Sequence, residues 1–264
     1  MLRLACFLLL LTILGVPEAI WPRHSAAPLR RKRWPVNLGL GTLNVLCLRV
    51  LLPWLAVDAA LWAQTNHFGL LPRLPIPPLL AAVIAYAALD LVIYAQHRVM
   101  HRLPLLWRLH RMHHTDLALD VSSGVRFHPG EIVLSMGIKM MTVVLLGAAP
   151  DVVLVFEIAL SSFSLLTHAN LAVPVAVDRG MRRVSATPDM HRIHHSVLDS
   201  EHDTNFGFQV SWWDRLFGTY RESPVSDQST LTLGLEGFRE PDQQRFTALL
   251  KQPIAATRAP LMAA

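Results

Sequence analysis

Five apolar runs constrain the fold of this chain more than any other feature of its sequence. As helices, with a rise of about 1.5 Å per residue, runs of this size approach or match the thickness of a bilayer's hydrocarbon core. The composition agrees, because 52% of the residues are apolar, 16% are charged and the mean hydropathy is +0.36, outside the usual range of soluble proteins. The runs are Leu4–Ile20, Leu38–Trp62, Leu79–Ala95, Ile132–Ala149 and Val152–Thr167.

The first run is either a cleaved signal peptide or a first membrane span. The densest positive cluster of the chain, Arg30–Arg33, follows it closely. Cleavage would leave this cluster outside the membrane, whereas short basic segments usually stay on the cytoplasmic side. We therefore favour an uncleaved span.

The remaining runs predict an all-α integral membrane helical bundle. Pro53 should kink the run from Leu38 to Trp62, and a loop with four prolines follows at 64–78. The short break Ala149–Asp151 separates the last two runs and predicts a helical hairpin that enters and leaves on one side. We expect about four spanning segments, two of them forming this hairpin, and a cytoplasmic helical cap that carries histidine boxes.

Histidine is concentrated in the second half of the chain, where ten of the 13 histidines fall between positions 97 and 195. Side chains three and four residues apart share a helix face, so HxxxH and HxxHH spacings aim two or three imidazoles at one point. Unrelated core or surface histidines would explain a single HxxxH well but three boxes poorly. The boxes are His97/His101, His110/His113/His114 and His191/His194/His195, and His128 and His168 lie between the last two.

Neutral imidazole is a ligand for zinc, copper, iron or nickel. One ion takes about four to six ligands, so this number of imidazoles suits two ions. Cys6 and Cys47 lie inside apolar runs and provide neither a disulfide framework nor a thiolate site. The sequence therefore predicts a site of two metal ions held by imidazole, with or without carboxylate.

The order of the spans predicts that all boxes lie on the cytoplasmic side. If Arg30–Arg33 is cytoplasmic, the second run leaves and the third returns, which places His97 in the cytoplasm. The hairpin also leaves and returns, which places the box at His191 there too. The arginines that then lie on the cytoplasmic side, as the charge rule prefers, are Arg98, Arg102, Arg108, Arg111 and Arg126.

Several functional classes fit poorly. The net charge of +5 comes from basic residues beside apolar spans and does not indicate a nucleic-acid partner. Neither a glycine-rich phosphate loop nor a GxSxG elbow occurs. A metal transporter would place its ligands near the middle of the membrane, whereas these boxes follow the ends of spans.

Two kinds of chemistry stay open on these residues. One is metal-assisted hydrolysis, in which a bound water becomes nucleophilic and a nearby carboxylate acts as base. The other is iron-dependent activation of O₂, which needs an apolar channel to bring a C–H bond to the metals and electrons from outside. A metal-dependent hydrolase or a non-catalytic metal-binding membrane protein is thus the alternative to an oxygenase.

The boxes belong to longer segments that resemble a known family. In chain order these are Asp90–His101, His110–His114, Arg126–Pro129, His191–His195 and Trp213–Thr219. About half of the chain, with three boxes in this order and at these separations, resembles the fatty acid hydroxylase/sterol desaturase superfamily of integral membrane non-haem di-iron enzymes.

The resemblance implies O₂-dependent hydroxylation or desaturation of a lipid, such as a sterol or a fatty-acyl chain, at two iron ions. It also implies a separate electron donor, either cytochrome b5-like or a ferredoxin with its reductase. No side chain beyond the metal ligands is expected to act in the C–H step. The ligands that it implies are His97, His101, His110, His113, His114, His168, His191, His194 and His195.

One position departs from part of this family. Fatty-acid 2-hydroxylase members carry a further HxxxH before the last box, and Ser164 stands four residues before His168, where its first histidine would be. Serine cannot replace imidazole, which argues against an acyl ceramide substrate. His128 is a candidate for the missing ligand or for a residue that supports one.

Carboxylates near the boxes are candidates for orienting the ligands, because a ligating histidine usually donates its second N–H to a carboxylate or carbonyl. Asp90 lies seven residues before His97, about two helical turns back, and a carboxylate inside an apolar run is costly unless paired. For the other candidates a helix cap, a helix end or a solvated charge explains the residue equally well or better. They are Asp120, Glu131, Asp203 and Asn170.

We divide the chain into N-terminal spans and loop (1–78), a histidine-box domain (79–222) and a peripheral C-terminal tail (223–264). The tail has prolines, glutamines and weak periodicity. Trp212, Trp213 and Tyr220 predict either an interfacial aromatic belt or packing of the cap on the membrane surface.

Overall fold

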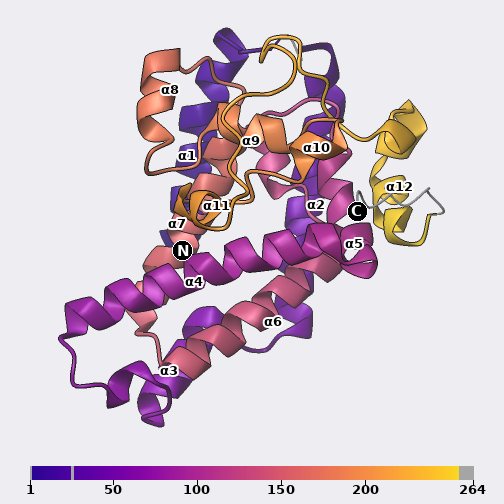
Figure 1. Ribbon diagram of the computed structural model, residues 1–264. Coiled ribbons are helices and arrows are strands. Elements are labelled where there is room, and N and C mark those ends of the chain that lie inside the picture. The colour runs from indigo at the N-terminus through magenta and orange to yellow at the C-terminus, as the bar shows by residue number, and fades with distance from the viewer. Residues whose placement is uncertain (1, 25–26, 256–264) are drawn as a thin grey trace.

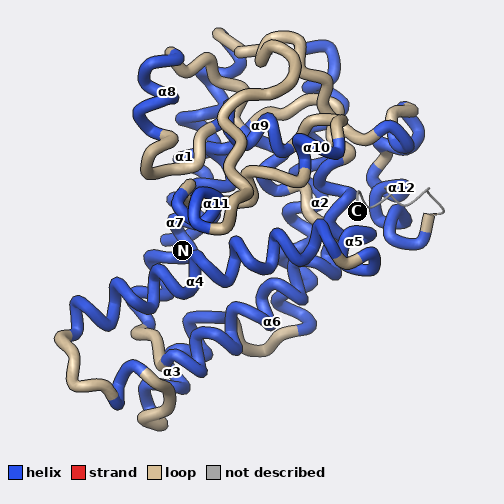
Figure 2. The backbone as a smooth tube through the Cα atoms, in the orientation of Figure 1, coloured by secondary structure: helices blue, strands red, loops and turns tan. Residues whose placement is uncertain are grey.

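The computed structural model describes residues 2–24 and 27–255. Within these ranges the protein consists of helices and loops without a strand (Figures 1 and 2), as the apolar runs predict. The longer helices are α1 (Leu2–Ile20), α2 (Ala27–Leu51), α3 (Ala56–Thr65), α4 (Pro78–Arg102), α5 (Pro104–His114), α6 (Pro129–Leu146) and α7 (Pro150–His168). The shorter ones are η1 (Leu71–Arg73), η2 (Val121–Val125), α8 (Val175–Met181), α9 (Pro188–His194), α10 (Asp199–His202), α11 (Trp212–Leu216), η3 (Glu236–Phe238), η4 (Pro241–Gln244), α12 (Phe246–Lys251) and η5 (Gln252–Ile254).

Five segments are long and apolar enough to cross a membrane. Four of them coincide with α1, α4, α6 and α7, and the fifth runs from Arg30 to Thr65 across both α2 and α3. The chain breaks between α2 and α3 at residues 52–55, where Pro53 lies. Proline lacks the N–H that continues a helix and clashes with the preceding turn, so the predicted kink is a full interruption.

The predicted hairpin is formed by α6 and α7. Gly147 ends α6 in the left-handed conformation, with φ of 66°, and its N–H donates to Val143 O at 2.9 Å. Pro150 then begins α7 at a position whose N–H needs no partner. Gly69, from the loop after α3, lies so close that an added Cβ would be 2.3 Å from Gly147 Cα. The turn therefore packs tightly against that loop.

Helices α3, α4, α6 and α7 form an apolar bundle, in which α4 and α6 run side by side (Figure 1). Its core contains three buried alanines of α3, namely Ala56, Ala59 and Ala60, together with Leu89 of α4 and Phe156 of α7. Small residues let helix backbones approach closely, which is the main source of helix packing energy inside a bilayer. Three helices of this bundle, α4, α6 and α7, contribute walls to an apolar cavity.

Buried charges attach α1 and α2 to η2 and to the segments that precede η2 and follow α7. Glu18 of α1 accepts from Arg30 at 2.7 Å and from the backbone N–H groups of Val121 and Asn170 at 3.0 and 2.9 Å. α1 is therefore an integral part of the packing.

The basic cluster after α1 is more than a solvated flank. Arg33 is 7% exposed, and its guanidinium donates to Asp116 and Asp120 at 2.6 Å each. A buried guanidinium that is paired twice retains its charge and fixes α2 against the loop before η2.

The C-terminal segment folds back over the cap and α2. Val197 N–H donates to Thr232 O at 2.9 Å, and Leu249 of α12 shares a small core with Leu40 of α2 and Met112 of α5. The described part of this segment thus covers the outer side of α5 (Figure 1).

Candidate metal centre

Nine of the ten histidines between positions 97 and 195 gather into two clusters, which we call cluster A and cluster B. Within each cluster, one ligand atom per residue lies within 4.8 Å of all the others. Cluster A consists of His97, His101, His110, His114 and His194. Cluster B consists of His113, His168, His191 and His195.

Both HxxHH boxes are divided between the two clusters. In each box the first and last histidines, four residues apart, share a helix face and belong to one cluster. The middle histidine belongs to the other cluster, and these middle residues are His113 on α5 and His194 on α9. Each HxxHH box therefore supplies ligands to both clusters, and the boxes at α5 and α9 link the two clusters.

Hydrogen bonds from Nδ1 orient six of the nine rings. Each acceptor is a carbonyl or carboxylate oxygen, so Nδ1 carries the proton and the lone pair is on Nε2. The six pairs are His97 with Phe206 O (2.8 Å), His101 with Asp203 Oδ1 (3.1 Å), His110 with Glu131 Oε1 (2.8 Å), His113 with Arg126 O (3.1 Å), His168 with Ser164 O (2.6 Å) and His194 with Thr204 O (2.7 Å).

This orientation brings two Nε2 lone pairs face to face in each cluster. His97 Nε2 lies 3.0 Å from His194 Nε2 in cluster A, and His113 Nε2 lies 3.0 Å from His168 Nε2 in cluster B. All four atoms are acceptors, so no hydrogen bond can form between them, and lone pairs at this distance repel. A cation bound by both nitrogens removes the repulsion, so the donor set fits a metal ion in each cluster.

Protonation is a poor alternative to metal binding. Burial, followed by the neighbouring imidazoles, holds the pKa of His114, His191 and His195 well below the ordinary value of 6.5. The same causes lower the pKa of His113 and His194. These rings are therefore neutral near pH 7 and available as ligands.

Two of the predicted carboxylates reach the histidines, and both serve cluster A. Glu131, in the first turn of α6, accepts from His110 and is buried. The side chain of Asp203, which accepts from His101, is 58% exposed. A carboxylate that accepts from a ligating histidine makes the ring a stronger ligand.

The loop after α10 provides two further acceptors. It carries Thr204 O and Phe206 O, which accept from His194 and His97. Asp214 stabilises this loop by accepting from the N–H groups of Phe206 and Gly207 at 2.8 Å each. Burial raises the pKa of Asp214 to about 6. Asp214 was not among the predicted site residues.

Two predicted residues lie apart from the clusters because other elements engage them. His128 begins α6, where its Nδ1 accepts from Gly130 N–H at 3.1 Å and its Nε2 donates to Leu250 O at 3.2 Å. Both ring nitrogens are occupied, so His128 is not placed as a ligand. Asp90 accepts from Trp213 Nε1 at 2.8 Å, and among the described residues no histidine donates to it.

Asp120 and Asn170 also serve the scaffold. Asp120 pairs with Arg33 and caps η2 through Ser122 N–H at 2.9 Å. The Asn170 side chain accepts from the backbone N–H of His24 and donates to its carbonyl, at 3.0 and 2.8 Å. In the described part of the chain, neither residue makes a hydrogen bond or ion pair with a cluster histidine.

Ser164, which stands where part of the family has histidine, connects α7 to η2 and orients His168. Its Oγ donates to Gly124 O at 2.8 Å, while its carbonyl accepts from His168 Nδ1. A Cβ on Gly124 would come 2.5 Å from Ser164 O, so η2 and α7 touch backbone to backbone here.

One further histidine lies at the edge of cluster A. His202 stacks on Trp107 with an interplanar angle of 4° and, with His101 and Asp203, forms a third group of potential donors. It stands outside the box spacings, and no pattern in the sequence singles it out.

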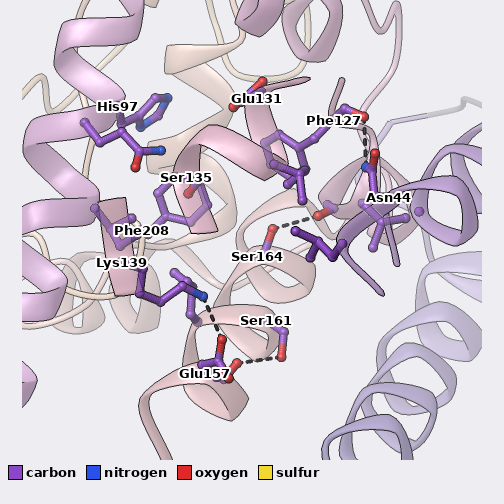
Figure 3. Close-up of a pocket in the computed structure, with 18 of the residues that line it drawn as sticks. Asn44, His97, Phe127, Glu131, Ser135, Lys139, Glu157, Ser161, Ser164 and Phe208 are labelled. Carbon is purple, nitrogen blue, oxygen red and sulfur yellow. Dashed lines mark hydrogen bonds and ion pairs between the residues drawn. The ribbon is translucent and has the colours of Figure 1, made fainter. Parts of the chain in front are cut away.

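An apolar cavity of about 260 Å³ adjoins cluster A between α1, α2, α4, α6 and α7. His97 and Glu131 lie at one end of it in Figure 3, and His110 also lines it. The walls are largely aliphatic and aromatic, with Ile93, Phe127 and Phe208 among them. A slender apolar chain in this cavity would come next to the cluster A imidazoles.

The opposite end of the cavity holds charges that the sequence analysis did not single out. Lys139 Nζ of α6 contacts Glu157 Oε1 of α7 at 2.8 Å, and Arg3 Nη1 of α1 contacts Glu157 Oε2 at 2.7 Å (Figure 3 shows the first contact). A signal was available, because Lys139 and Glu157 are the lone charged residues of their apolar runs.

Comparison with known proteins agrees with this geometry. The family model described as fatty acid hydroxylase matches residues 82–219, which is half of the chain and contains all nine cluster histidines. Ornithine lipid hydroxylase OlsE of Rhizobium tropici is 30% identical over 179 residues, which are 68% of this chain and 52% of that protein. No solved structure matches the chain.

More distant relatives are also lipid oxygenases by name. Alkylglycerol monooxygenase of Danio rerio is 28% identical over 55% of this chain and 31% of its own length. Cholesterol 25-hydroxylase of Rattus norvegicus is 26% identical over 69% of this chain and 60% of its own length. The chain thus spans from about a third to somewhat over half of these relatives. On the family match, which confirms the resemblance seen in the sequence, the chain belongs to the fatty acid hydroxylase family.

Proposed function

We propose that this protein is a membrane-bound, O₂-dependent di-iron oxidoreductase that hydroxylates a lipid, with desaturation as a close variant. The observation that carries the proposal is the pair of facing Nε2 lone pairs in each of two adjoining clusters, beside an apolar cavity. Two iron ions held by the nine histidines would supply the reduction of O₂ and the oxidation of a C–H bond.

The chain's own residues would hold the metal ions, orient the ligands and enclose the space for the substrate. Phe206 O, Glu131 and Ser164 O fix the tautomer and direction of His97, His110 and His168, so little reorganisation is needed when metal binds. The aromatic walls of the cavity exclude water from the side of cluster A and admit an apolar chain. No other side chain is required as acid or base in the C–H step.

The proposal extends to the surroundings of the enzyme. The substrate would enter from the bilayer, because helices long and apolar enough to span it surround the cavity. The clusters would face the cytoplasm, where a separate electron donor, cytochrome b5-like or a ferredoxin with its reductase, would dock. The arginines that follow the span ends support this side.

Metal analysis of protein purified anaerobically with iron supplied is the first test. We expect about two irons per chain in wild type, since two imidazole clusters are present. His113→Ala or His194→Ala should remove both ions, because each residue lies on a helix that is shared by the clusters. His128→Gln is the matched control, since glutamine can keep both hydrogen bonds of His128 and should retain the iron.

Oxygen uptake that depends on added reductant and accompanies a hydroxylated or desaturated lipid would support the oxidoreductase. Zinc that persists when iron is supplied, without such uptake, would instead favour a metal-dependent hydrolase. One ion per chain would contradict the two-site assignment.

A further inference from the structure

The charged end of the cavity contains a Lys139–Glu157–Arg3 cluster, in which a lysine and an arginine share a single carboxylate. The side chains of Lys139 and Glu157 are 8% and 0% exposed, and that of Arg3 is 41% exposed. Three ionic side chains among apolar helices are costly, and residues of this kind usually mark a substrate path or binding site. Two cations and one anion leave one positive charge without balance.

The lysine has unused hydrogen-bonding capacity. An ammonium group carries three N–H donors, and among the described residues Glu157 Oε1 is the acceptor of Lys139 Nζ. Lys139 and Glu157 both line the cavity, as does Ser161 one turn further along α7. An anion at this end of the cavity would balance the charge and accept the free donors.

The position of this cluster relative to the histidines is set by α6. Glu131, which accepts from His110, and Lys139 are on the same helix, eight residues or about 12 Å apart. Between them the cavity walls are mostly apolar, and include Ile132 and Leu160. The cavity therefore presents a cationic end, an apolar middle and an imidazole end, which is the pattern of an amphiphile.

We propose that the Lys139–Glu157–Arg3 cluster binds an anionic group of the lipid substrate, a carboxylate or a phosphate, while its apolar chain extends toward cluster A. The distance from the bound anionic group to cluster A then determines which carbon of the chain lies beside the metal ions. This inference deepens the proposed function, because it names the substrate class of the same cavity as an anionic amphiphile. The alternative is that the cluster only joins α1, α6 and α7, and the experiment must distinguish this role from anion binding.

The test measures binding under argon without reductant, so that no turnover occurs. Purified iron-loaded protein in phosphatidylcholine nanodiscs is titrated with dodecanoate, dodecyl phosphate and methyl dodecanoate, by displacement of a fluorescent fatty acid. We expect the wild type to prefer at least one anion over the ester by on the order of tenfold, because a hydrogen bond to a charged group is worth more than one to a neutral group. The preferred anion distinguishes a carboxylate from a phosphate substrate.

Lys139→Met should abolish the preference and leave the affinity for the ester unchanged, whereas Lys139→Arg should retain the preference. If Lys139→Met does not fold, the triple variant Arg3→Leu, Lys139→Met, Glu157→Leu removes all three charges of the cluster and should show the same loss. Equal affinity of wild type for ester and anions, or an equal loss for all three probes in the variants, would overturn the proposal. Because binding is measured without turnover, this result is separate from oxygen uptake and product formation, which test the proposed function.

Discussion

Clusters A and B use the same ligand type in different surroundings. In cluster A two rings donate to carboxylates, His110 to Glu131 and His101 to Asp203. In cluster B the acceptors of Nδ1 include the backbone carbonyls of Arg126 and Ser164, and no carboxylate within the described residues. Cluster A also borders the cavity, whereas none of the cluster B histidines lines it.

This difference indicates that the two clusters have different roles, although both consist of histidines. A carboxylate partner adds negative charge to a ligand and strengthens it, and both such partners belong to cluster A, where Glu131 also lines the cavity. The cluster B histidines come from α5, α7 and the C-terminal end of α9, and backbone carbonyls orient two of them, His113 and His168. We infer that cluster A lies next to the substrate and that cluster B holds the second ion, farther from the cavity.

Removing one ligand from each cluster should give the largest effects and test this division directly. His110→Ala and His168→Ala should each reduce product formation by more than about a hundredfold, since loss of an outer partner alone costs about 10–100-fold. The affinity of a fluorescent fatty acid, measured without turnover, should change for His110→Ala alone, because His110 lines the cavity and His168 does not. An equal change in probe affinity for both variants would remove the distinction between a near and a far cluster.

Removing charge without removing the hydrogen bond should give an intermediate effect. Glu131→Gln can still accept from His110 Nδ1 but loses the negative charge in a buried position. We expect iron affinity to fall by about 10–100-fold, read from the iron retained against a chelator.

Asp203→Asn is the matched control for that variant. Asp203 makes the same kind of contact, but its side chain is 58% exposed, so water screens its charge and the fall should be only a few-fold. If the two variants lose iron equally, burial of the carboxylate is not what distinguishes Glu131.

The helices and the clustered histidines were predictable because both follow local rules. Length and hydropathy identify α1, α4, α6 and α7, Pro53 marks the break after α2, and the spacing of four residues places His97 and His101 on one face. These features depend on neighbours within a few positions. The division of each HxxHH box between two clusters depends on which helices pack against both sides, which spacing does not encode.

The partners of the histidines were less predictable, because many of them are backbone carbonyls. Every residue has a backbone carbonyl, so residue type does not indicate that Phe206 O or Ser164 O accepts from an imidazole. Asp90 shows the converse, since helical spacing relates it to His97, but Trp213, far away in the sequence, binds its carboxylate. Lys139 and Glu157 could have been found, because a lone charge in an apolar run is a local signal.

The smallest expected effect concerns Asp214, which supports cluster A from a distance by holding the N–H groups of Phe206 and Gly207. Asp214→Asn loses one of these acceptors and should lower stability at pH 7 by about 1–3 kcal/mol. Burial raises the pKa of Asp214 from 3.8 to about 6, so between these values the folded protein holds a proton that the unfolded chain has released.

The contribution of Asp214 to stability must therefore decrease as pH rises from about 4 to about 6, and stay constant above that range. Asparagine does not titrate, so the Tm difference between wild type and Asp214→Asn should be widest near pH 4 and narrow toward pH 7. A difference that widens with pH would mean that the ionised carboxylate is the form the fold prefers. Since Phe206 O accepts from His97 and no cluster B ring, any accompanying loss of metal should begin at cluster A.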